Sequence, residues 1–130
     1  MNPSGEQREA ERREQRLVQA LELEFRRQGH EVARLKIVPP GERRPLFCDL
    51  YDKTANTLIE AKGSVTREAV RMGIGQLYDY RRFVDGEVAL GLLLPEAPRP
   101  DLLALIGSAG ADAWWPTEIG FISSALVPSA

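Results

Sequence analysis

The sequence predicts a single α/β domain in which helices cover both faces of a mixed β-sheet. Residues 9–28 carry apolar side chains at helical spacing, from Leu17 to Phe25. Short strand-forming segments follow, separated by turn residues. Residues 88–94 form a continuous apolar run, which is typical of a central strand buried on both faces. Because helical segments precede, interrupt and follow the strands, we expect helices on both sides of the sheet.

The first half of the chain predicts one helix and three strands, of which the last two form a hairpin. Gly29 ends the helix in the usual position of a C-terminal cap. The consecutive prolines Pro39 and Pro40 end the first strand, and a turn-forming segment separates the second strand from the third. The predicted elements are a helix over residues 9–28 and strands over residues 31–38, 46–51 and 58–62.

The second half of the chain predicts alternating helices and strands. Thr66 is a typical N-cap for the middle helix, and Asp85 and Gly86 form the turn that follows it. The predicted elements are a helix from Thr66 to about residue 84, a strand over residues 88–94, a short helix over residues 101–106, and short strands near residues 113–115 and 120–122. The element order is therefore αβββαβαβ, or the same order with one further strand at the C-terminal end.

The size and composition indicate one soluble domain. The 130 residues, of which 43% are hydrophobic and 28% charged, suffice for a single core. We expect residues 1–8 to be a flexible N-terminus, residues 9–123 to form the domain, and residues 124–130 to be a C-terminal tail. No apolar stretch is long enough to cross a membrane. Cys48 is the single cysteine, which excludes an internal disulfide and fits a reducing cytoplasm.

The charge is unevenly distributed along the chain. The net charge of −2 comes from 17 basic and 19 acidic residues, which excludes a histone-like polycation. Residues 86–130 contain one basic and five acidic residues, so they carry −4, and residues 1–85 carry +2. The larger part of the chain is therefore compatible with nucleic acid as a partner, even though the whole chain is acidic.

The predicted hairpin gathers the residues that indicate chemistry. Glu60 and Lys62 are two positions apart on a strand and therefore share a face, and Asp49 lies on the preceding strand. Two carboxylates on adjacent strands form a hard-oxygen site suited to Mg²⁺, to which the backbone carbonyl of Ala61 adds a ligand. Lys62 beside the metal positions an attacking water and stabilises charge on a phosphate. The alternative is a salt-bridged hairpin on a solvated sheet face.

Two motifs in this order resemble the PD-(D/E)XK nuclease superfamily. Asp49, ten intervening residues and then Glu60, Ala61 and Lys62 match its central motif, with Cys48 in place of the proline. Residues 76–80 are similar to the Gln-x-x-x-Tyr motif of the RecB and Cas4 branch, on the helix that follows the lysine strand. This resemblance covers about residues 9–94 and implies a restriction-endonuclease-like fold.

The resemblance also implies an activity and a role for each motif residue. The activity is Mg²⁺-dependent hydrolysis of phosphodiester bonds in DNA, with Mn²⁺ as a substitute, in a restriction, repair or phage-defence system. Asp49, Glu60 and the Ala61 carbonyl would hold the metal, and Lys62 would act on the water. Gln76 would orient the site, and Tyr80 would contact the nucleic-acid backbone.

Further candidates come from the helices and from one loop. The family often carries a metal-directed acid on the first helix, and Glu14 is the candidate here because it continues the apolar stripe, with Glu11 and Glu22 as alternatives. Five arginines are candidates for gripping phosphates: Arg67, Arg71, Arg81, Arg43 and Arg44. Pairing with acidic residues on the helix surface is the alternative for the helical arginines.

Other polar and aromatic residues indicate structural roles. We expect His30 to be structural, Asp52 to cap the hairpin turn, and Trp114 and Trp115 to pack in the core and at the sheet edge. Asp52 is also the alternative to Asp49 as a metal ligand.

Two other functions remain open beside the nuclease. One is a nucleic-acid-binding module of the same fold with weak or no cleavage, and the other is an interaction domain of a larger complex. A domain this small has little surface for choosing a target, so a homodimer or a larger assembly is expected. The motifs do not separate DNA from RNA, or endonuclease from exonuclease.

Overall fold

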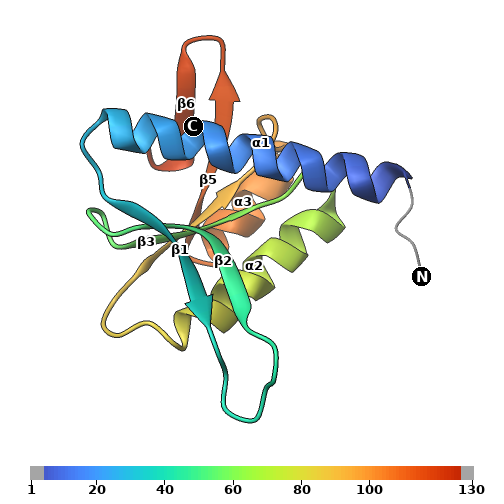
Figure 1. Ribbon diagram of the computed structural model, residues 1–130. Coiled ribbons are helices and arrows are strands. Elements are labelled where there is room, and N and C mark those ends of the chain that lie inside the picture. Colours follow the sequence, from blue (N-terminus) through green and yellow to red (C-terminus); the bar gives the residue numbers. More distant parts are fainter. Residues whose placement is uncertain (1–4, 127–130) are drawn as a thin grey trace.

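The computed structural model describes residues 5–126, which form a six-stranded mixed sheet and three α-helices (Figure 1). The helices are α1 (Gly5–Arg27), α2 (Arg67–Arg81) and α3 (Pro100–Ser108). The strands are β1 (Val32–Ile37), β2 (Leu46–Asp52), β3 (Thr57–Ala61), β4 (Ala89–Leu93), β5 (Ala111–Thr117) and β6 (Gly120–Ser123), and a short 3₁₀ helix (Ser124–Leu126) follows. The predicted α/β class and the order with one further strand are confirmed.

The strands lie in the sheet in the order in which they occur in the chain. β1, β2 and β3 are antiparallel neighbours, β3, β4 and β5 are parallel, and β6 is antiparallel to β5. The parallel pairs require crossover connections, and α2 and α3 provide them. The crossover through α2 places that helix immediately after the candidate residues on β3.

Helices cover both faces of the sheet, each over its own core (Figure 1). On one face, Leu17, Leu21 and Phe25 of α1 pack against Leu50 and Ile59. On the other face, α2 and α3 pack against the opposite sides of the same strands. β4 is buried on both sides from its second residue onward, as the apolar run over residues 88–94 predicts.

Two predicted boundaries differ from the structure. α1 begins at Gly5, so residues 5–8, expected to be flexible, are helical, because no proline interrupts this segment and its charged side chains are solvated. In the expected tail, Ser124–Leu126 form a 3₁₀ turn. Residues 1–4 and 127–130 lie outside the described residues. Within residues 5–126, no helix is long and apolar enough to span a membrane.

Candidate functional site

The candidate site lies at a fork where β2 leaves β3. The two strands pair from Asp52 and Thr57 as far as Leu50 and Ile59, and beyond that point β2 pairs with β1 alone. Asp49 is the first residue past the last pair. At the fork, side chains replace the bonds of the ladder: the Ala61 N–H donates to Asp49 Oδ2 at 2.9 Å, and the Asp49 N–H donates to Glu60 Oε1 at 3.4 Å. The two carboxylates are therefore neighbours, as the motif predicts.

A β-bulge in β2 sets the direction of Asp49. Ala33 pairs with Tyr51 and Leu35 with Cys48, so one residue of β1, Arg34, faces both Asp49 and Leu50. As a result, Cys48 packs in the core under α2, whereas Leu50, two positions later, packs in the core under α1. Bulges re-aim side chains at strand ends and sites, and this one turns Asp49 toward the open fork.

Glu60 and Lys62 share a face of the sheet, as their spacing predicts, and α2 covers this face. They are nearly buried, with exposed fractions of 5% and 9%. Burial, and after it the negative charge of Asp49, raise the pKa of Glu60 to about 8, although the ammonium group of Lys62 opposes the shift. A Cβ on Gly73 would overlap Leu92 and lie 3.4 Å from Lys62 Cγ, so this glycine lets α2 pack directly on the lysine stem.

α1 reaches the same site through Gly63, the residue after Lys62. The Gly63 N–H donates to Glu14 Oε1 at 3.1 Å, and Arg13 Nη1 donates to the Gly63 carbonyl. A Cβ on Gly63 would overlap the backbone of Ala10, so only glycine permits this close approach. Burial raises the pKa of Glu14, and the hydrogen bond from Gly63 lowers it. The positive charge of Lys62 also lowers this pKa and the negative charge of Asp49 raises it, so both site charges act on Glu14.

Of the three acids considered on the first helix, Glu14 is the one that reaches the site. Glu22 pairs with Arg26 at 3.2 Å, and Glu11 is exposed at the rim. Together with Asp49 and Arg34, these three glutamates line a cleft of about 580 Å³ between α1 and the β1–β2 strands. The α1 wall of the cleft is therefore acidic.

Gln76 and Tyr80 lie three and seven positions after Gly73, so they belong to the side of α2 that packs on Lys62. Gln76 Oε1 is buried and has no hydrogen-bond partner within residues 5–126. Tyr80 packs in the core with an exposed fraction of 5%, and Glu60 adds to the burial that raises the pKa of its phenol. Because the ring lies inside the protein beside Glu60, its contact with a nucleic-acid backbone stays a prediction.

Whether the site can hold a metal ion depends on which side chains lie close enough together to share one. Among residues 5–126, no group of three or more His, Cys, Asp and Glu side chains is placed to hold one. Glu14 therefore does not complete a three-carboxylate site with Asp49 and Glu60 in this conformation, because its carboxylate is bound to the Gly63 N–H.

The pair of Asp49 and Glu60 nevertheless fits Mg²⁺. This ion binds through one or two carboxylates and keeps several waters, and a cation would relieve the repulsion that raises the pKa of Glu60. The Ala61 carbonyl lies on the same edge of β3 as its N–H, which faces Asp49. The structure thus supplies two carboxylates and a carbonyl, which is the predicted set without Glu14.

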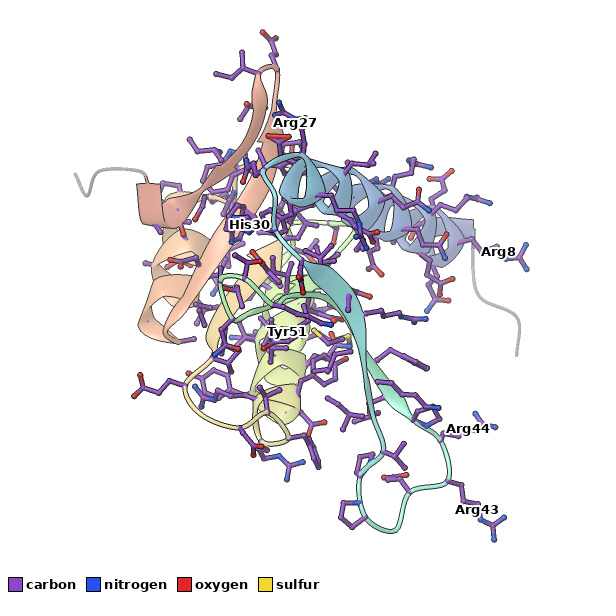
Figure 2. All side chains as sticks on the ribbon, turned by 60° about the vertical axis from the view of Figure 1, so that its left-hand side comes forward. Arg8, Arg27, His30, Arg43, Arg44 and Tyr51 are labelled. Carbon is purple, nitrogen blue, oxygen red and sulfur yellow. The ribbon has the colours of Figure 1, made fainter. Side chains whose placement is uncertain are left out.

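The candidate arginines do not gather in one patch. Arg67 pairs with Asp101 at the start of α2, where Arg71 is exposed, and Arg81 lies over the Tyr78 ring at the other end of the helix. At 1.5 Å per residue, the two ends of α2 are about 21 Å apart. Arg43 and Arg44 lie on the loop between β1 and β2, and Figure 2 shows them pointing away from the body of the protein.

His30, Asp52 and Trp114 make contacts that fit the structural roles expected of them. His30 Nδ1 lies 2.7 Å from Asp52 Oδ2. The other carboxylate oxygen of Asp52 accepts from the N–H groups of Thr54 and Ala55, so Asp52 caps the turn and is not an alternative to Asp49. Trp114 packs edge-on against Phe25 at 5.5 Å between ring centroids.

Sequence reasoning missed three contributors to the site. Arg13 holds the strand end after Lys62, and no pattern in the sequence indicates that contact. The bulge opposite Arg34 was missed because strand irregularities depend on pairing. Cys48 donates to the Ile59 carbonyl at 3.3 Å and so closes the inner corner of the fork. Burial raises the pKa of its thiol to about 12, so it stays protonated at neutral pH.

Comparisons of the chain with protein-family models, with curated proteins and with solved structures find no match.

Proposed function

We propose that this protein is a Mg²⁺-dependent nuclease domain of the PD-(D/E)XK type that hydrolyses phosphodiester bonds in DNA. The observation that carries the proposal is the fork between β2 and β3, where Asp49 and Glu60 are neighbours on diverging strands. Lys62 follows on the face of Glu60, nearly buried under α2. Burying two carboxylates and a lysine together lowers the stability of the fold, and such groups are typical of catalytic sites. Their burial therefore favours a catalytic role over a salt bridge on the surface.

The arrangement of the elements supports a restriction-endonuclease-like fold. The first six elements follow the order αβββαβ, and the pairing changes from antiparallel to parallel at β3. α1 and α2 cover opposite faces of β3, and both contact the residues around Lys62. This is the mixed, two-sided sheet that the resemblance implies.

Each residue of the fork has a task in the proposed reaction. Asp49 and Glu60, oriented by backbone N–H groups, hold the metal with the Ala61 carbonyl. Bound Mg²⁺ polarises a phosphate oxygen and lowers the pKa of a water. Lys62 orients the attacking water and stabilises charge on the phosphate. The unpaired Gln76 Oε1 accepts a hydrogen bond from that water or from the lysine.

A second candidate is a nucleic-acid-binding module that cleaves weakly or not at all. The specific observation in its favour is that Glu14 is bound to Gly63, which leaves two side-chain ligands rather than three. A site with fewer ligands holds the metal more weakly.

The proposal is tested by incubating the purified protein with supercoiled plasmid, single-stranded DNA and RNA in Mg²⁺, Mn²⁺ or EDTA. We expect metal-dependent cleavage that Lys62→Ala abolishes. The matched control is Lys53→Ala, since Lys53 is exposed in the hairpin turn. Cleavage that persists in Lys62→Ala contradicts the proposal. Binding without cleavage on every substrate favours the second candidate.

A further inference from the structure

The strands β1 and β2 continue past the fork as a two-stranded arm, defined here as residues 34–47. No register with β3 extends along this part of β2, and the arm projects from the body of the protein (Figure 1). The arm contains four basic side chains, Arg34, Lys36, Arg43 and Arg44, and one acidic side chain, Glu42. The arm therefore carries a net charge of +3 in a chain whose net charge is −2.

One face of the arm combines Arg34 and Lys36 with an exposed aromatic ring. Arg34 and Lys36 alternate with inward-facing residues and are exposed. Phe47 is the cross-strand partner of Lys36, and 36% of it is exposed. The guanidinium carbon of Arg34 lies over the Phe47 ring, 4.1 Å from its centroid, so the two side chains form a cation–π pair.

This face leads from the tip of the arm to the candidate site. Arg43 and Arg44 lie at the outer end (Figure 2), and Lys36 and Phe47 follow toward the body. Arg34 and Asp49 both line the cleft beside α1. Lys36, Phe47 and Arg34 thus lie along the arm between its tip, which carries Arg43 and Arg44, and the cleft that Asp49 lines.

We propose that this face of the arm binds a single strand of nucleic acid and leads it to Asp49. Arginine and lysine side chains contact phosphates, and an unpaired base stacks on the Arg34–Phe47 pair. A base inside a duplex has both faces covered by its neighbours, so the ring pair selects an unpaired base. The acidic α1 wall of the cleft repels phosphates and keeps the backbone on the side of the arm. The end point of the path rests on the proposed function, whereas the binding itself does not.

The test is fluorescence anisotropy of labelled oligothymidylate with the full chain in EDTA, over a series of salt concentrations. We expect Arg43→Ala/Arg44→Ala to weaken binding about tenfold at low salt and to lower the salt slope by about 1.4, or about 0.7 for each lost phosphate contact. Phe47→Leu keeps an apolar side chain and removes the ring, and we expect a loss of about tenfold. The melting temperature of each variant checks that it is folded.

The matched control is Arg26→Ala/Arg27→Ala, which removes the same charge near the C-terminal end of α1. Arg27 lies far from Arg43 and Arg44 in Figure 2. The inference would be overturned if this control weakened binding as much as Arg43→Ala/Arg44→Ala, or if that double variant bound the oligonucleotide normally. It would also be overturned if the protein bound a duplex equally well or bound polyglutamate more tightly. Because the assay contains no metal, failure of the nuclease proposal leaves a positive result standing. If the arm variants cleaved DNA normally, the proposed role of the arm would be wrong and the nuclease proposal would still stand.

Discussion

Each end of the β2–β3 hairpin buries a carboxylate, but the two carboxylates differ in how completely they are hydrogen-bonded. At the turn, Asp52 has an exposed fraction of 2%, and its two oxygens are bound by His30, Thr54 and Ala55. At the fork, Glu60 is buried to a similar degree but has one long bond at 3.4 Å and a second carboxylate beside it. A carboxylate whose two oxygens are both paired stabilises the fold, whereas two adjacent carboxylates with one backbone bond each are suited to share a cation.

The largest expected effect is on cleavage, and it distinguishes the carboxylate at the fork from the carboxylate at the turn. We expect Asp49→Asn to lower metal-dependent cleavage about 1000-fold, because it removes one of two charged ligands while keeping the bond from the Ala61 N–H. Cleavage rates on plasmid and single-stranded DNA measure this effect. Asp85→Asn, on an exposed turn, is the charge-matched control and should cleave normally.

The second effect concerns stability at the turn end. Asp52→Ala removes the partner of His30 and two backbone bonds, so we expect a loss of about 3 kcal/mol in the free energy of unfolding. Urea denaturation measures it. Asp49→Asn should unfold at nearly the same urea concentration as the wild-type chain. Equal destabilisation by both variants would remove the distinction between the two ends.

The third effect is a pH dependence at the fork. The pKa of Glu60 is about 8 in the folded protein against an ordinary value of 4.5, so the folded chain holds an extra proton between those pH values. The contribution of this group to stability is therefore fully present below pH 4.5 and is lost as the pH rises through 8. Relative to Glu60→Gln, the wild-type chain should lose about 2 to 4 kcal/mol between pH 5 and pH 9.

Thermal unfolding across this pH range in EDTA checks the expected loss. A constant difference between Glu60→Gln and the wild-type chain would contradict it. Mg²⁺ should restore stability to the wild-type chain at pH 9 and leave Glu60→Gln nearly unchanged, because ligand binding stabilises the form that binds it.

The smallest effect tests the contact between α1 and the fork. Gly63→Ala would push against the backbone of Ala10, so we expect a loss of about 2 kcal/mol and lower cleavage. Gly75→Ala is the matched control, because a Cβ there meets nothing within 4 Å and alanine favours the helix by about 1 kcal/mol. Melting temperatures that fall for Gly63→Ala and rise for Gly75→Ala would confirm the close approach of α1.

Local patterns were enough to predict the elements and the pairing of the site residues. The spacing of Leu17, Leu21 and Phe25 predicts which side of α1 is buried, and the structure confirms it. The two-residue spacing of Glu60 and Lys62 predicts their common face. These features depend on the periods of helices and strands, which a sequence displays directly.

The features that could not be predicted depend on contacts between distant segments. The bulge opposite Arg34 depends on how β1 and β2 pair, and the hold of Arg13 on Gly63 depends on where α1 crosses the sheet. The sequence places Gly63 directly after Lys62, but the need for glycine there comes from the backbone of Ala10, which lies 53 positions earlier in the sequence. The resemblance implies that Tyr80 contacts a nucleic-acid backbone, but it did not indicate that the packing of α2 buries this side chain.

The central claim is that Asp49 and Glu60 share one divalent cation within reach of Lys62. A crystal structure of the protein soaked with Mn²⁺, with the ion located by its anomalous scattering, tests this claim most directly. The account predicts a single Mn²⁺ between the two carboxylates at the fork, with the Ala61 carbonyl as a further ligand. Mn²⁺ bound elsewhere, with the fork carboxylates still bonded only to backbone N–H groups, would contradict it.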